Sequence, residues 1–154
     1  MGISTIIRWN SDVIEESIVR IADQLLKPRV LHSLPGRVRI HLPLLKRADR
    51  DSIPLGEAIA AAERVLPGVK RIAPSLVSGN ILIEYDVSVT SESTILATIR
   101  TITKSALRHR DRFFAVAPES RKTTLDKLVE YFGSIETERL EREEELVLPD
   151  EIWS

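Results

Sequence analysis

A short alternating segment places the strongest constraint on the fold of this chain. From Gly36 to Leu42, apolar and polar side chains alternate without interruption. The apolar set is Val38, Ile40 and Leu42, and the polar set is Arg37, Arg39 and His41. Successive side chains of a strand point to opposite faces of a sheet, so this period of two predicts a half-buried β-strand. Other elements must then cover one face of the sheet that contains it.

The segments that follow alternate between helix and strand signals. The predicted elements are a helix from Ser52 to Leu66, strands over Val69–Leu76 and Ile81–Asp86 joined around Ser78-Gly79-Asn80, a helix that starts at Thr90 or Ser91 and runs past Ala106, and a fourth strand over Arg112–Pro118. With the first strand, the order is β-α-β-β-α-β. This order predicts an α+β, ferredoxin-like fold, in which two helices cover one face of a four-stranded antiparallel sheet.

Extensions are predicted on both sides of this central unit, which spans residues 29–118. Residues 1–28 carry apolar side chains at helical spacing, with Pro28 as the end, and predict an amphipathic helix. Residues 119–154 begin with a second amphipathic stretch and continue into a charged tail. A chain of 154 residues has room for one domain with such additions.

The composition excludes several classes of protein. There is no cysteine, so disulfides, zinc ribbons, thiolate copper sites and cysteine nucleophiles are all excluded. No apolar run approaches the roughly 20 residues that cross a bilayer, and charged residues interrupt the start of the chain, where a signal peptide would need an apolar stretch. We therefore expect a cytoplasmic protein that is not transmembrane.

Three segments in order carry a resemblance to a known family. They are Leu31–Pro43, Leu66-Pro67-Gly68-Val69, and Ser78-Gly79-Asn80 followed by an apolar strand that ends in Tyr85-Asp86. Together they resemble the cysteine-less branch of the heavy-metal-associated (HMA-like) domain family, which is related to the N-terminal domains of metal-transporting P-type ATPases. The resemblance implies a ferredoxin-like fold and a link to metal homeostasis or to a transport assembly.

The chain departs from the metal-carrying members of that family in the loop after the first strand. Those members place Cys-x-x-Cys there, whereas Leu44–Ser52 contains lysine, arginine, aspartate and serine. Soft monovalent copper needs thiolates, so a copper-chaperone mechanism is not expected. The remaining metal candidates are His41 with Asp49 or Asp51, as a weak zinc or nickel site. His32 or His109 could hold haem, but nothing in their spacing argues for it. We expect no cofactor.

Catalytic patterns are missing as well. The sequence contains no acid–base pair at a useful spacing, no nucleophile elbow and no phosphate-binding loop. His109-Arg110-Asp111 has the first three letters of a kinase catalytic loop but lacks the leucine and asparagine that must follow. The sequence therefore predicts that the protein is not an enzyme.

Two basic surfaces are predicted. Arg37 and Arg39 lie on the polar side of the first strand, and Arg100, Lys104 and Arg108 lie four apart on the second helix, opposite its apolar stripe. They suggest a nucleic-acid surface. However, sheets of this topology that bind RNA stack bases on aromatic side chains, and alternation turns Tyr85 inward. Pairing between basic and acidic strands is the simpler explanation.

The tail gives the main functional hypothesis. Residues 136–151 contain eight acidic and two basic residues. Apolar side chains nevertheless occur near the end of this segment and beyond it, at Leu146, Leu148, Ile152 and Trp153. We expect a non-enzymatic binding or adaptor protein that docks on a larger partner through this segment. Packing of the same side chains on their own domain is an equal alternative. A metal or haem carrier and a nucleic-acid-binding regulator are the other candidate functions, and the sequence leaves the oligomeric state open.

Overall fold

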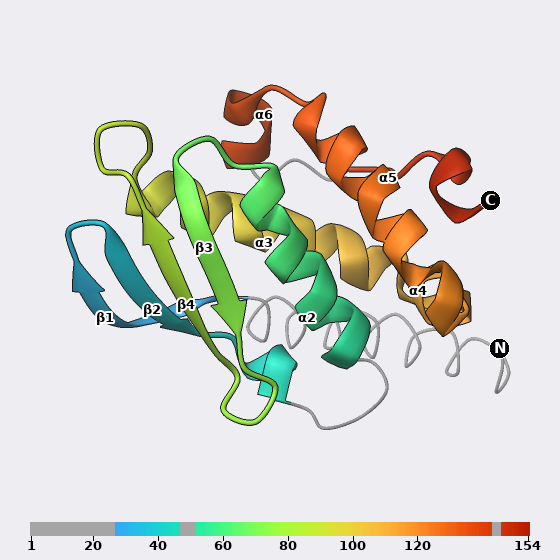
Figure 1. The fold of residues 1–154 in the computed structure, drawn as a ribbon, viewed down its shortest axis with the longest axis horizontal. Helices are drawn as coiled ribbons and strands as arrows, with labels where there is room; N and C mark the ends of the chain where they lie inside the picture. The colour runs from blue at the N-terminus through green and yellow to red at the C-terminus, as the bar shows by residue number, and fades with distance from the viewer. Residues whose placement is uncertain (1–26, 47–51, 143–145) are drawn as a thin grey trace, which may run out of the picture.

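The computed structural model describes residues 27–46, 52–142 and 146–154. It contains a four-stranded antiparallel sheet in the order β1-β2-β4-β3 (Figure 1). The strands are β1 (Arg29–Leu34), β2 (Arg37–His41), β3 (Val69–Pro74) and β4 (Asn80–Tyr85). Residues 1–26 of the helix predicted over residues 1–28 lie outside the described residues, and so do the metal candidates Asp49 and Asp51. The sheet confirms the α+β class.

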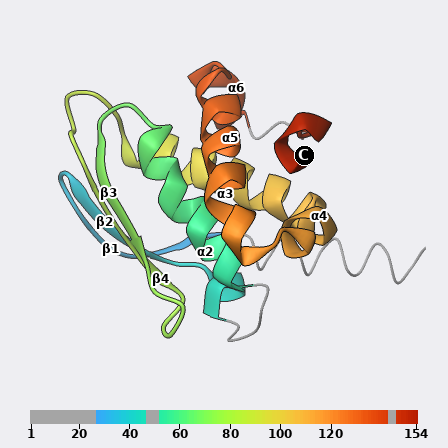
Figure 2. The same ribbon diagram turned by 45° about the vertical axis from the view of Figure 1, so that its right-hand side comes forward.

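Helices lie on one side of this sheet (Figures 1 and 2). The α-helices are α2 (Ser52–Ala61), α3 (Glu92–Arg108), α4 (Arg110–Ala115), α5 (Arg121–Gly133) and α6 (Thr137–Glu141), and the short 3-10 turns are Pro43–Lys46, Ala62–Arg64, Pro118–Ser120 and Asp150–Trp153. Ser91 begins α3, because its hydroxyl accepts a hydrogen bond from the backbone N–H of Thr94. Across the described ranges, each helix is too short or too polar to span a membrane.

The core lies between the sheet and the helices. The strands contribute Val38, Ile40, Ile72, Ile81 and Ile83, and α3 contributes Ile95, Ile99 and Ile102. The same cluster continues into α5, α6 and the C-terminal segment through Leu128, Phe132, Leu140, Leu146, Leu148 and Ile152. The elements after residue 118 therefore share one core with the sheet.

The first strand of the sheet was missed in the sequence. Residues 29–34 form β1, which joins β2 through a tight turn at Pro35 and Gly36. Gly36 has a φ of 79°, and proline followed by a glycine of positive φ is typical of a type II turn. A Cβ on Gly36 would lie 3.0 Å from the carbonyl oxygen of Tyr85, so the close approach of β4 also favours glycine here.

The fourth strand predicted over Arg112–Pro118 is wrong, because residues 110–115 form helix α4. That strand would have needed the sheet edge beside β2, and β1 already pairs there. The observed order of elements is therefore β-β-α-β-β-α, and the predicted order β-α-β-β-α-β is not found. Within this order, β2, α2 and β3 form a crossover unit whose two strands are separated by β4.

Candidate interaction surface

One face of the sheet carries no described helix (Figures 1 and 2). The side chains of Val38 and Ile40 are fully buried against the helices, so their neighbours on β2 point the other way. The cross-strand pairs on this open face are Arg37 with Glu84, Arg39 with Leu82, and His41 with Asn80. The alternation predicted for the first half-buried strand is therefore confirmed in β2.

Four arginines gather on this open face. Arg29 is the cross-strand partner of His41, and Arg71 is the partner of Glu84, so both share the face with Arg37 and Arg39. All four side chains are exposed. We call these four residues (Arg29, Arg37, Arg39 and Arg71) the basic face. Arg29 and Arg71 were not identified from the sequence, although Arg71 lies in a predicted strand and would have followed from its register.

The basic face has little neutralising charge. Glu84 stands between Arg37 and Arg71 in the register of the sheet. Among the residues that the structure describes, none of the four arginines has an acidic oxygen within 4.0 Å. By contrast, Arg64 pairs with Asp126 at 2.9 Å and Arg121 pairs with Glu57 at 3.0 Å on the helical side. The open face therefore keeps an excess of positive charge.

The second predicted basic set does not join this surface. Arg100, Lys104 and Arg108 lie on α3, which packs on the opposite side of the sheet from the basic face (Figure 1). Each of the three also has an interaction partner in the chain. The structure thus places the two basic sets on different sides of the sheet, and among the described elements no helix covers the arginines on the sheet.

Two of the histidines that were candidate metal ligands, His41 and His32, lie on the sheet. The His41 Nδ1–H donates to Asn80 Oδ1 at 2.9 Å, and this bond ties the end of β2 to the start of β4. His32 is exposed on β1. Within residues 27–46, 52–142 and 146–154, no three histidine or carboxylate side chains group as metal ligands. His41 therefore has a structural role that the sequence did not reveal.

The C-terminal segment packs on its own domain. Leu146, Leu148 and Ile152 are only 1%, 3% and 4% exposed. His109 holds this segment: its Nδ1–H donates to the Ser105 carbonyl at 2.9 Å, and its Nε2 accepts from the Leu148 N–H at 3.3 Å. Self-packing, the alternative left open by the sequence, is the arrangement found, so these side chains are not available to a partner.

Aromatic rings complete this attachment. The Trp153 ring stacks on His109 with centroids 6.1 Å apart and forms a T-shaped pair with Phe113, with centroids 5.0 Å apart. Arg112 Nη1 also lies 2.8 Å from Asp150 Oδ1. Trp153 therefore anchors the chain to its own α3–α4 junction, and the predicted anchoring of a foreign partner does not fit this conformation.

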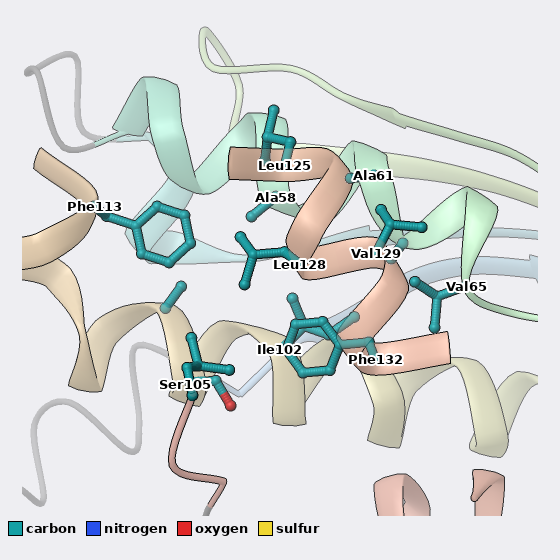
Figure 3. A pocket seen from close by; sticks show the side chains of 13 residues that line it. Ala58, Ala61, Val65, Ile102, Ser105, Phe113, Leu125, Leu128, Val129 and Phe132 are labelled. Atoms are coloured by element: carbon teal, nitrogen blue, oxygen red, sulfur yellow. The ribbon is translucent and has the colours of Figure 1, made fainter. Parts of the chain in front are cut away.

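A small apolar cavity lies between the helices and this segment (Figure 3). Ala58, Ile102, Phe113 and Leu128 line it together with Leu148. Its volume is about 10 Å³, which is at the lower limit for a space that can hold one water molecule. The cavity is a gap in the packing of α2, α3, α4, α5 and the C-terminal segment, and it is too small for a cofactor or substrate.

Comparison of the chain with family models, curated proteins and solved structures finds no match in any of the three.

Proposed function

We propose that the protein is a non-enzymatic adaptor that holds an acidic partner protein against its basic face. The observation that carries this proposal is the set of four exposed arginines on a sheet face that no described helix covers. We assign to this surface the docking role that was expected for the C-terminal segment, because the C-terminal side chains are buried in the core of their own domain.

Arginine is well suited to such a role. Its planar guanidinium offers paired N–H donors that match the two oxygens of a carboxylate, and it remains charged at any physiological pH. Unpaired surface arginines also raise the association rate of an acidic partner through long-range attraction, which salt screens over about 8–10 Å. Adjacent strands of a sheet lie about 4.8 Å apart, so Arg29 and the arginines of β2 are close enough to contact the same acidic segment.

Nucleic acid is the second candidate for the same face, since phosphates also select arginine. The composition of the face favours a protein. The paired positions around the arginines are occupied by Leu82, Asn80, Ala73 and His32, and Tyr85 is buried on the other side of β4. A single-stranded nucleic acid would lack the aromatic platform that usually supports it.

The link to metal homeostasis or to a transport assembly rests on the family resemblance, and it would identify the setting in which the adaptor works. A metal-carrying mechanism is not part of the proposal. The described residues offer His41, already bonded to Asn80, and no surrounding set of ligands.

Binding to polyglutamate in solution tests the proposal. We expect the protein to bind fluorescently labelled polyglutamate with an affinity that falls as salt is raised, and Arg37→Ser combined with Arg39→Ser to weaken binding by about tenfold or more, as loss of two charge-assisted contacts implies. The matched control is Arg110→Ser combined with Lys122→Ser, which removes two exposed charges from α4 and α5 and should leave binding nearly unchanged.

Two results would contradict the proposal. Equal weakening by both pairs of substitutions would show that only net charge matters. If single-stranded DNA of the same charge binds much more tightly than polyglutamate and competes with it, the partner of this face is a nucleic acid.

A further inference from the structure

The two edges of the sheet differ in whether another strand can pair with them. At the β3 edge, the backbone N–H of Ile72 donates to Glu63 Oε1 at 3.1 Å and therefore points away from β4. Backbone direction alternates along a strand, so Pro74, two residues later, occupies the next outward position and has no N–H. Proteins block exposed edges with such devices, and the β3 edge is closed to strand pairing.

The β1 edge has neither device. All six residues from Arg29 to Leu34 are exposed, and this stretch contains no proline or lysine. In the described part of the chain, the backbone of β1 forms hydrogen bonds with β2 alone. Residues of an edge strand direct their N–H and C=O outward in alternation, so β1 presents unpaired donors and acceptors on its free side before and after the bulge between Val30 and His32.

The side chains of β1 are also incompletely covered. Val30, Leu31 and Leu34 are 42%, 43% and 50% exposed, which is high for large apolar residues. Val30 pairs with Ile40 and so faces the helical side, whereas Leu34 pairs with Arg37 and faces the open side. A strand added beside β1 would cover apolar surface on both faces of the sheet.

We propose that the partner's acidic segment binds as a fifth, outermost strand along the free edge of β1. The inference rests on the proposed function and specifies how its partner binds. On the open side, the added strand would place its side chains about 4.5–5.5 Å from those of β1, within reach of Arg29. On the helical side it would lie beside Val30. The segment that fits best alternates acidic residues with β-branched apolar ones.

Charge selects this occupant over a second copy of the same chain. Antiparallel pairing of β1 with β1 would join the two basic faces into one continuous surface. That surface would carry both sets of four arginines, with Glu84 as the acidic side chain at the paired positions of each copy. Like charges on a shared face destabilise pairing, whereas an acidic strand neutralises them.

Backbone N-methylation of a synthetic peptide tests strand addition separately from charge. The probe is a peptide of about eight alternating glutamates and valines, the length of an ordinary strand. In a strand, the glutamate N–H groups point to one edge and the valine N–H groups to the other. Methylating all glutamate nitrogens or all valine nitrogens therefore gives two peptides of equal charge that each lose the donors of one edge.

We expect the parent peptide to bind and only one of the two methylated peptides to lose affinity, by about tenfold or more, because it forfeits several backbone hydrogen bonds. Saturating parent peptide should also slow amide exchange in residues 29–34 and leave residues 69–74 at the β3 edge unchanged. A peptide of alternating lysine and valine should not bind.

The outcomes separate this inference from the proposed function. Strand addition is wrong if both methylated peptides bind as well as the parent, or if polyglutamate binds and the alternating peptide does not. In either case the proposal that the basic face binds an acidic partner remains supported. Absence of binding by polyglutamate and by every peptide would overturn both. A concentration-dependent dimer that protects residues 29–34 without any peptide would identify a second copy as the occupant, against the proposal.

Discussion

Replacing Leu148 by alanine tests whether the C-terminal segment belongs to the core. Leu148 is 3% exposed, lines the small cavity between the helices, and lies beside Phe113 and Leu128, which line it too. Removing the rest of its side chain would enlarge a space of about 10 Å³ that the surrounding helices already fail to fill. Leucine-to-alanine substitutions at such sites lower the free energy of unfolding by about 2–5 kcal/mol.

That loss is large for a chain of this size. Total stabilities are about 5–15 kcal/mol, and 1 kcal/mol moves the midpoint of thermal unfolding by about 2–4 °C for a domain of 150–250 residues. We therefore expect Leu148→Ala to lower the urea midpoint markedly with an unchanged denaturant slope, and to lower the Tm by about 5 °C or more.

Val147 provides a matched control. It is the neighbour of Leu148 in the chain, but it is 66% exposed. We expect Val147→Ala to change the free energy of unfolding by less than about 0.5 kcal/mol, as is usual for surface positions. If the two substitutions have equal effects, the C-terminal segment does not pack as described, and the hypothesis that Leu146, Leu148, Ile152 and Trp153 dock on a partner returns.

Two further substitutions probe single contacts. His109→Phe keeps a ring beside Trp153 but leaves the Leu148 N–H without its acceptor, so it should cost about 1–3 kcal/mol in urea unfolding, and an unchanged midpoint would show that this bond does not hold the segment. The Ser88 hydroxyl and N–H both donate to Asp86 Oδ1, which lowers the pKa of Asp86 below its ordinary 3.8. The wild type should therefore be more stable than Asp86→Asn at pH values above 3.8, and it should lose this advantage as the pH falls through the lowered pKa of Asp86 in the folded protein. A difference in urea unfolding that does not change with pH would refute this.

The sequence predicted the central part of the fold well where local signals were strong. The alternation around β2, the glycine turn before β4 and the start of α3, placed at Thr90 or Ser91 and found at Ser91, were all identified, because each depends on neighbouring residues in the chain. β1 was missed although Pro35-Gly36 is a turn signal, since Arg29–Leu34 lacks a clear alternation. The bulge between Val30 and His32 breaks its period of two.

The remaining errors concern contacts between distant segments. Arg112–Pro118 has an apolar centre that suits a strand as well as a helix, and only occupancy of the edge by β1 decides between them. The sequence left the position of Leu146 and Ile152 open because their burial depends on contacts with other elements of the core. The basic face was half predicted: Arg37 and Arg39 were named, but Arg29 joined them only through the pairing of β1 with β2.

Mapping polyglutamate onto the protein by NMR tests the central claim most directly. The basic face predicts that amide and arginine side-chain shifts concentrate on β2 and on Arg29 and Arg71 as polyglutamate is added, and that they reverse when salt is raised. Shifts centred on Arg100, Lys104 and Arg108 of α3, with the sheet unaffected, would contradict the account.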